Sequence, residues 1–150
     1  MRCTFERTVE IGRPPESVFP WIEEPERQKL WMKGLEENRL VDGGTTRAGA
    51  RIKMRIKEGR RRSEYDGEIT AYDRPRHLAL RFWGGAFPKG VEMHVDYRLE
   101  NLAGRTRLHY VGWCELKGFW MRLFGPLMKL FAGIQLNSFL KKLKRLAEAE

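Results

Sequence analysis

The sequence predicts an α+β protein in which a curved antiparallel sheet of seven strands is covered on its concave face by a long C-terminal helix. Three observations lead to this prediction. One alternating segment near the N-terminus is followed by two short helical stretches. Six further alternating segments then succeed one another between turn signals. The chain ends with apolar residues that repeat at helical spacing.

The first strand and the two short helices are predicted from a change of period. Residues 4–11 alternate in polarity with a period of two, which is typical of a half-buried strand, with Arg7 as the exception on the apolar side. After the prolines at 14–15 the apolar residues follow a helical spacing. Pro20 limits the first helix to little more than two turns, and Pro25 is suited to open a second helix in its first turn.

Turn signals rich in glycine, proline and charged residues divide the next part of the chain into six segments. Short links between them indicate a meander of antiparallel hairpins. One side of each strand is apolar and the other carries acidic and basic residues, so we expect an apolar inner face. Trp83, Val111 and Trp113 are exceptions, either as rim residues or as signs of a bulge. The expected strands lie near residues 36–42, 49–57, 62–72, 77–83, 90–100 and 105–115.

The C-terminal segment predicts one long helix over residues 126–147, which Gly125-Pro126 would start or kink. Such a helix is about 33 Å long at 1.5 Å per residue. Seven strands form a sheet about 34 Å wide, so the helix is long enough to cover it. Because one helix cannot fill the hollow of a bent sheet, the sequence predicts a cavity between the two.

Two segments carry a resemblance to a known family. Residues 9–35, VEIGRPPESVFPWIEEPERQKLWMKGL, resemble the first strand and two short helices of the polyketide cyclase/dehydrase and lipid-transport-like family of the Bet v 1/START-like (SRPBCC) superfamily. Residues 124–150, FGPLMKLFAGIQLNSFLKKLKRLAEAE, are similar to its glycine-proline-led C-terminal helix. The resemblance covers essentially the whole chain. It implies a helix-grip fold and a single ligand-binding domain over residues 1–150.

The family resemblance also implies a pocket and a strand pairing. Members bind lipids, sterols, polyketides or other hydrophobic ligands, and a minority catalyse reactions on them. In the family's topology the first strand pairs with the last, which would place Cys3 near Cys114. In a reducing compartment we expect both thiols to be free.

The candidate ligand-binding residues are those expected to face the cavity. Inward tyrosine hydroxyls would orient a hydrophobic ligand, or else they belong to a solid core. The same two alternatives apply to the inward tryptophan, methionine and phenylalanine side chains. Arg7 is either a clamp for a ligand carboxylate or a rim residue in water. The candidates are Arg7, Trp31, Met54, Tyr65, Phe82, Met93, Tyr97, Tyr110, Leu127 and Phe131.

No catalytic residue is assigned from the sequence. His94 and His109 share the parity of outward charged residues, and His77 opens a strand beside Arg76. Metal-binding and nucleotide motifs are lacking, so we expect no metal and no cofactor. The predicted function is binding or transport of a hydrophobic small molecule, lipid or polyketide-like. The alternative is a cyclase or dehydratase-type enzyme acting in the same cavity, and the shortage of inward Asp, Glu and His favours binding.

Charge and hydropathy bear on partners and location. The formal net charge is +9, but acidic rows alternate with the basic ones on the expected outer face, which argues against a nucleic-acid partner. Without a leader-like or membrane-spanning segment, we expect a cytoplasmic protein. Residues 119–131, with Lys117, Arg122 and Lys129, resemble an interfacial amphipathic segment. A transient membrane-surface contact therefore stays open, as does the oligomeric state.

Overall fold

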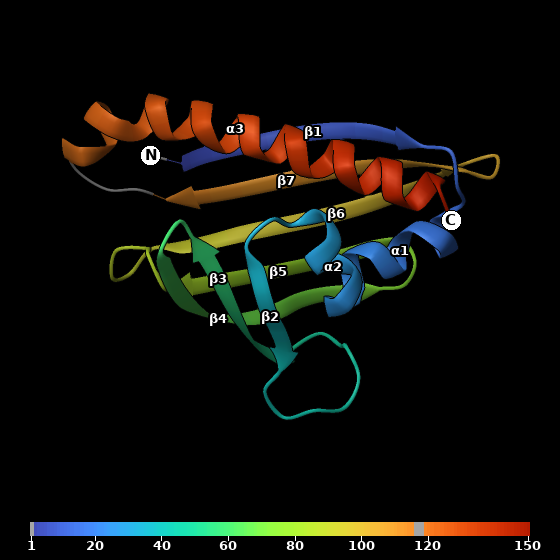
Figure 1. The fold of residues 1–150 in the computed structure, drawn as a ribbon, viewed down its shortest axis with the longest axis horizontal. Coiled ribbons are helices and arrows are strands. Elements are labelled where there is room, and N and C mark those ends of the chain that lie inside the picture. The colour runs from blue at the N-terminus through green and yellow to red at the C-terminus, as the bar shows by residue number, and fades with distance from the viewer. Residues whose placement is uncertain (1, 116–118) are drawn as a thin grey trace.

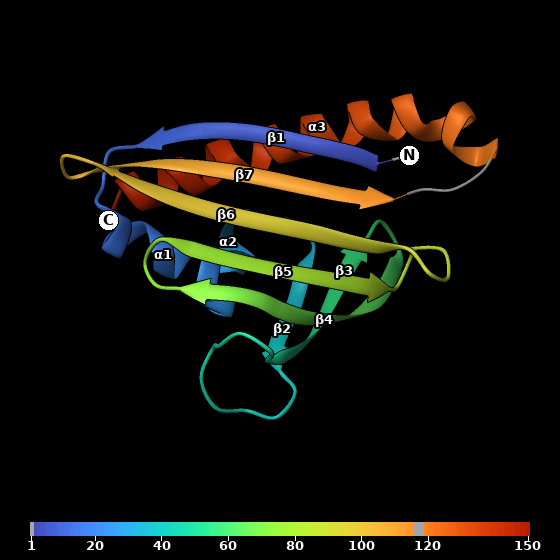
Figure 2. The same ribbon diagram turned by 180° about the vertical axis from the view of Figure 1, so that it is seen from behind.

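The computed structural model describes the backbone of residues 2–115 and 119–150, and the side chains of residues 2–115 and 132–150. A curved antiparallel sheet carries the helices on its concave side (Figure 1), and its convex side faces the viewer in Figure 2. The strands are β1 (Arg2–Ile11), β2 (Leu35–Leu40), β3 (Arg51–Glu58), β4 (Arg61–Asp73), β5 (His77–Gly84), β6 (Glu92–Leu102) and β7 (Arg105–Glu115). The helices are α1 (Pro15–Glu23), α2 (Pro25–Trp31) and α3 (Phe119–Glu148).

The sheet is a meander that the first strand completes. The strand order is β1-β7-β6-β5-β4-β3-β2, with antiparallel pairing between neighbours. This arrangement confirms the predicted fold class and the predicted pairing of the first strand with the last. Cys3 and Cys114 stand opposite each other in that pairing, so their predicted proximity is confirmed. Both are free cysteines in the structure.

Pro25 opens α2 as the sequence predicted, whereas Pro15, which was expected to precede the first helix, is the first residue of α1. Pro15 and Pro25 occupy the first turns of α1 and α2, where a missing backbone N–H costs nothing. The helices are tied to each other because the indole N–H of Trp31 donates to the carbonyl of Trp21 at 2.8 Å. Trp31 is 2% exposed, so this tie fixes its ring inside the molecule.

The start of the long helix differs from the prediction. α3 begins at Phe119 and runs through Gly125-Pro126, so the expected start near residue 126 was wrong. A proline inside a helix removes one backbone hydrogen bond and bends the helix instead of always ending it. Periodic apolar residues precede Pro126 as well as following it, and helical structure therefore continues on both sides.

α3 is held against β1 by polar contacts. They are Arg7 Nε to Asn137 Oδ1 at 2.8 Å, Lys144 Nζ to the carbonyl of Glu10 at 2.6 Å, and the backbone N–H of Gly12 to Glu148 Oε2 at 2.7 Å. At the C-terminal end, Trp21 Nε1 donates to Glu150 Oε2 at 3.1 Å, beside α1 (Figure 1). The helix therefore follows the β1 edge of the sheet.

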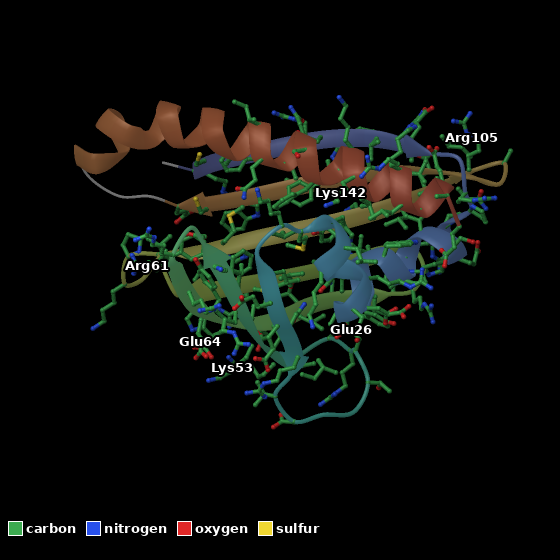
Figure 3. All side chains as sticks on the ribbon, viewed as in Figure 1. Glu26, Lys53, Arg61, Glu64, Arg105 and Lys142 are labelled. Atoms are coloured by element: carbon green, nitrogen blue, oxygen red, sulfur yellow. The ribbon has the colours of Figure 1, made fainter. Side chains whose placement is uncertain are left out.

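The core lies on the concave side, and the convex side is charged. Cross-strand ion pairs join the acidic and basic rows, for example Arg51 to Glu68 at 3.4 Å. Figure 3 shows charged side chains such as Lys53 and Glu64 directed away from the interior. The alternating acidic and basic rows of the outer face are therefore paired with each other across neighbouring strands.

The outward tryptophans lie on the convex face without a bulge beside them. His94 stacks on Trp113 with ring centroids 3.9 Å apart, and the guanidinium of Arg2 lies 4.0 Å from the centre of the same indole. Trp83 is likewise approached by Arg81 at 4.9 Å. The register shifts of the sheet occur elsewhere, in β2 and β4. Parity alone therefore places the two indoles on the outer face.

Thr106 on β7 tests how the residues just before α1 are held on the sheet. Its side chain is fully buried, and its hydroxyl donates to the carbonyl of Arg13 at 2.7 Å. Thr106→Val keeps the shape and removes the donor, so we expect it to lower the free energy of unfolding by about 1–3 kcal/mol. Urea denaturation measures the change. Thr70→Val, at an exposed position on β4, is the matched control, and equal effects of the two substitutions would contradict the prediction.

Candidate functional site

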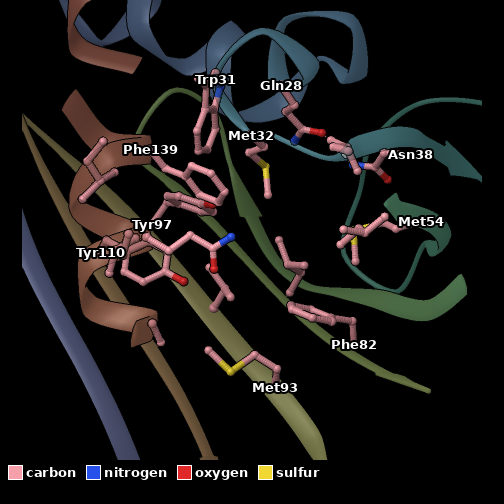
Figure 4. A pocket seen from close by; sticks show the side chains of 18 of the residues that line it. Gln28, Trp31, Met32, Asn38, Met54, Phe82, Met93, Tyr97, Tyr110 and Phe139 are labelled. Carbon is pink, nitrogen blue, oxygen red and sulfur yellow. Dashed lines mark hydrogen bonds between the residues drawn. The ribbon is translucent and has the colours of Figure 1, made fainter. Parts of the chain in front are cut away.

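A cavity of about 240 Å³ lies between the concave face of the sheet and the helices α2 and α3 (Figure 4). Most of the described side chains around it are aliphatic, aromatic or thioether groups, and none of them is charged at neutral pH. The apolar ones are Phe5, Trp31, Met32, Leu35, Ile52, Met54, Ile56, Leu80, Phe82, Met93, Val95, Ala132, Leu136, Phe139 and Leu140. The polar ones are Gln28, Asn38, Tyr97, Tyr110 and Gln135.

The helical side of the cavity is formed by aromatic contact between α2 and α3. Trp31 and Phe139 meet edge to face, with ring centroids 6.4 Å apart. Trp31 is fixed by its hydrogen bond to Trp21, so it positions the ring of Phe139 against the cavity. Opposite them the sheet contributes flexible side chains, including Met54 and Met93.

Two tyrosines bring hydroxyl groups to the sheet side of the cavity. Tyr97 on β6 and Tyr110 on β7 are cross-strand partners, and their rings meet edge to face at 5.3 Å. Burial raises the pKa of Tyr97 well above 10 and raises the pKa of Tyr110 to about 12. Both hydroxyls are therefore protonated at neutral pH. No described residue forms a hydrogen bond with either of them.

A hydrogen-bonded amide pair forms the opposite polar part of the lining. Asn38 Nδ2 donates to Gln28 Oε1 at 2.6 Å, and Gln28 Nε2 donates to the carbonyl of Ile22 at 2.6 Å. A second, outer cavity of about 420 Å³ lies under the loop that joins β2 to β3. Gln28 and Asn38 line both cavities, together with Ile52 and Leu80. The amide pair therefore belongs to the partition between the two spaces.

Six of the ten sequence-predicted binding residues come together around the inner cavity. They are Trp31, Met54, Phe82, Met93, Tyr97 and Tyr110. Leu127 and Phe131 lie outside the residues whose side chains the structure describes.

The other two candidates do not line the cavity. Tyr65 has the expected inward parity, but its ring packs edge to face under Phe82 and Phe87, and its hydroxyl accepts the backbone N–H of Ala86 at 3.3 Å. Arg7 is directed to α3, where it bonds Asn137. It is an exposed contact between strand and helix.

Several lining residues were missed by the sequence analysis. Gln28 is 8% exposed and lies three residues before Trp31 on α2, a spacing that places both on one helix face. That spacing was a usable signal. Asn38 carried no comparable signal, because its role depends on a partner ten residues away in a different element.

The histidines are held by partners outside the cavity, in agreement with their parity. His77 Nε2 lies 2.8 Å from Asp96, and His109 Nε2 lies 2.8 Å from Glu6. His94 stacks on Trp113 on the convex face. Within the described part of the chain no three His, Cys, Asp or Glu side chains are placed to hold a metal ion. No helix among the described residues is long and apolar enough to cross a membrane.

The comparison with protein families matches residues 2–148 to the family described as polyketide cyclase / dehydrase and lipid transport. The chain belongs to this family. A comparison with curated proteins gives no match. The family resemblance stated from the sequence is thereby confirmed, and the predicted helix-grip fold is confirmed by the strand order and by the solved neighbours.

Solved structures share the fold at low sequence identity. An aromatase/cyclase (Zhui) from Streptomyces sp. R1128 superposes with a TM-score of 0.75 at 14% identity, covering 99% of this chain and 94% of that one. A START superfamily protein from Mycobacterium smegmatis gives 0.74 at 14% identity, with 97% of each chain covered. Ara h 8.0201 gives 0.73 at 17% identity over the full length of both chains. These likenesses concern the fold.

Tyrosine ionisation predicts how stability depends on alkaline pH. Burial, followed by the hydrogen bond to Glu23, raises the pKa of Tyr72 to about 12, and burial raises the pKa of Tyr110 to about 12. An unfolded tyrosine has a pKa of about 10, so the unfolded chain loses these protons first. Stability is therefore intact below about pH 10 and falls as the pH rises towards 12.

Urea denaturation at about pH 9 and about pH 11 measures this loss, together with the ultraviolet absorbance of tyrosinate. Tyr110→Phe removes one contributor, so we expect a smaller difference between the two pH values in the variant. An unchanged difference would show that Tyr110 does not contribute.

The amide pair supplies a second stability prediction. Asn38→Ala leaves the side-chain amide oxygen (Oε1) of the buried Gln28 without its donor. We expect this to lower the free energy of unfolding by about 1–2 kcal/mol. Asn137→Ala removes an exposed amide that bonds Arg7, and it is the matched control with a smaller expected cost. Chemical denaturation compares the two variants.

Proposed function

We propose that this protein binds and carries an uncharged hydrophobic small molecule, lipid or polyketide-like, within one ligand-binding domain spanning residues 1–150. The observation that carries the proposal is the inner cavity of about 240 Å³ with its apolar, uncharged described lining. Concave, mostly apolar sites with a few polar groups are the usual form of small-molecule sites. Membership of a family described by cyclisation, dehydration and lipid transport supports it further.

The ligand-binding residues in this proposal are those that the cavity brings together. Trp31 and Phe82 provide flat aromatic walls, Met54 and Met93 provide flexible contacts, and the tyrosine pair provides hydroxyls. The placement of Leu127 and Phe131 at the same cavity stays a prediction from the sequence. So does a transient membrane contact through residues 119–131, whose side chains lie outside those described.

Binding fits the lining better than catalysis does. A cyclase or dehydratase moves protons, which requires a group whose pKa lies near the working pH. The described lining contains no Asp, Glu, His, Lys or Arg, and burial raises the pKa of Tyr110 to about 12. A carrier needs none of these groups. The proposed location is the cytoplasm, as the sequence predicts.

A filled cavity tests the proposal. Ala132 on α3 lines the cavity, and Ala132→Trp would place an indole in the ligand's space. Ile134→Trp lies on the same helix at an exposed position and is the matched control. We expect the wild type and the control to bind the neutral fluorescent probe N-phenyl-1-naphthylamine, and Ala132→Trp to bind at least about 10-fold more weakly.

Native mass spectrometry of the purified protein, followed by solvent extraction, identifies any copurified molecule. Thermal unfolding verifies that both variants are folded. A wild type that binds no probe and carries no molecule, or an Ala132→Trp variant that binds as well as the control, would overturn the carrier proposal.

A further inference from the structure

The tyrosine pair and Asn38 are the polar side chains that the described strands bring to the cavity, and the two tyrosines lie together. Tyr97 and Tyr110 are directly opposite in the pairing of β6 with β7, and both side chains enter the cavity (Figure 4). Neighbouring strands lie about 4.8 Å apart, so two opposite side chains on one face reach the same small volume. Their hydroxyls are therefore placed to contact a single ligand group.

Neither hydroxyl has its hydrogen bond satisfied by the residues that the structure describes. Both side chains line the cavity, so a ligand bound there can supply the hydrogen-bond partner that the described residues do not. The amides of Gln28 and Asn38, which also line the cavity, are already bonded to each other. Tyr97 and Tyr110 therefore present hydroxyls to the cavity that no described residue bonds, whereas the buried hydroxyl of Ser63 on β4, also without a described partner, lies outside the cavity lining.

Gly112 makes the space that the hydroxyl of Tyr110 occupies. A Cβ atom built at position 112 would lie 3.0 Å from the Tyr110 hydroxyl oxygen and 3.0 Å from Met93 Cε. The backbone of Gly112 lies within β7 and outside the positive-φ region that requires glycine. Glycine weakens a strand interior, so its presence here is explained by the close approach of the tyrosine side chain.

From this arrangement we propose that the hydroxyls of Tyr97 and Tyr110 anchor a neutral carbonyl-type acceptor at one end of an apolar ligand, and that Gly112 positions Tyr110 for this contact. The inference rests on the proposed function and specifies the ligand's chemistry. Two protonated hydroxyls offer two donors, which match the two lone pairs of a ketone, ester or quinone oxygen.

The charge of the lining favours a neutral acceptor over a carboxylate. An anion in the cavity would lose its hydration without gaining a cationic partner among the described lining residues. Arg7, which the sequence suggested as such a partner, is not among the described lining residues and is bonded to Asn137. A ligand with the same apolar body but a carboxylate end is therefore expected to bind more weakly.

Matched probes test the anchor. 2-Acetylnaphthalene carries a ketone, 2-isopropenylnaphthalene has the same shape with CH₂ in place of oxygen, and 2-naphthoate carries a carboxylate. Their dissociation constants are measured by displacement of N-phenyl-1-naphthylamine. We expect the wild type to prefer the ketone over the alkene by about 3- to 10-fold, because hydrogen bonds are formed only by the ketone. The naphthoate is expected to bind most weakly.

Three variants and one control locate the effect. Tyr97→Phe and Tyr110→Phe each reduce the ketone preference to less than about 2-fold while leaving the affinity for the alkene within about 2-fold of the wild type. Tyr65→Phe, a buried tyrosine outside the cavity, keeps the preference. Gly112→Ala retains both hydroxyls but displaces that of Tyr110, and it is expected to lose the preference as Tyr110→Phe does. Thermal unfolding and alkene affinity report whether each variant is intact.

The outcomes separate this inference from the carrier proposal. Equal binding of ketone and alkene by the wild type, or an unchanged preference in both phenylalanine variants, overturns the anchor and leaves the carrier proposal standing. An unchanged preference in a folded Gly112→Ala variant overturns the positioning role of Gly112. A wild type that binds none of the three probes overturns both proposals.

Discussion

The placement of α3 along β1 leaves the interior of this protein open over the central strands. Arg7 reaches Asn137, and Lys144 reaches the carbonyl of Glu10, so the helix is attached along one edge of the concave face. The two elements lie close, since a Cβ atom at Gly133 would be only 3.0 Å from Arg7 Nη2. A helix held there cannot also rest on the central strands, and the space over those strands is the cavity.

Segregation of charge complements this geometry. Acidic and basic side chains pair across the strands on the convex face, and there they remain in contact with water. The described side chains around the cavity are uncharged. The structural neighbours share this architecture at 14–17% identity, so the architecture tolerates extensive replacement of residues.

The sequence predicted the features that depend on local periodicity. Alternation along single strands was enough to place Phe82, Met93 and Tyr97 on the concave face, and Pro25 was enough to place the start of α2. Alternation along a strand indicates which face of the sheet a residue lies on, but it does not indicate which other segment packs over that residue.

Features that depend on distant segments could not be predicted in this way. Tyr65 has the correct face, but the turn after β5 brings Phe87 over its ring. Arg7 and Asn38 obtained their roles from α3 and from α2, whose positions relative to β1 and β2 are set by the fold as a whole. The hydrogen-bonding state of Tyr97 and Tyr110 likewise follows from three-dimensional packing.

The described cavity lining includes Met32, Met54 and Met93, from the α2–β2 connection, β3 and β6. An unbranched thioether has three rotatable side-chain bonds and low barriers between its rotamers, so it changes outline while the backbone stays still. A cavity lining rich in methionine therefore discriminates poorly between ligands of similar size and shape. For the ligand proposed above, selectivity would therefore reside in directional hydrogen bonds, and conservative exchanges among the apolar lining residues would alter the tightness of fit more than the choice of ligand.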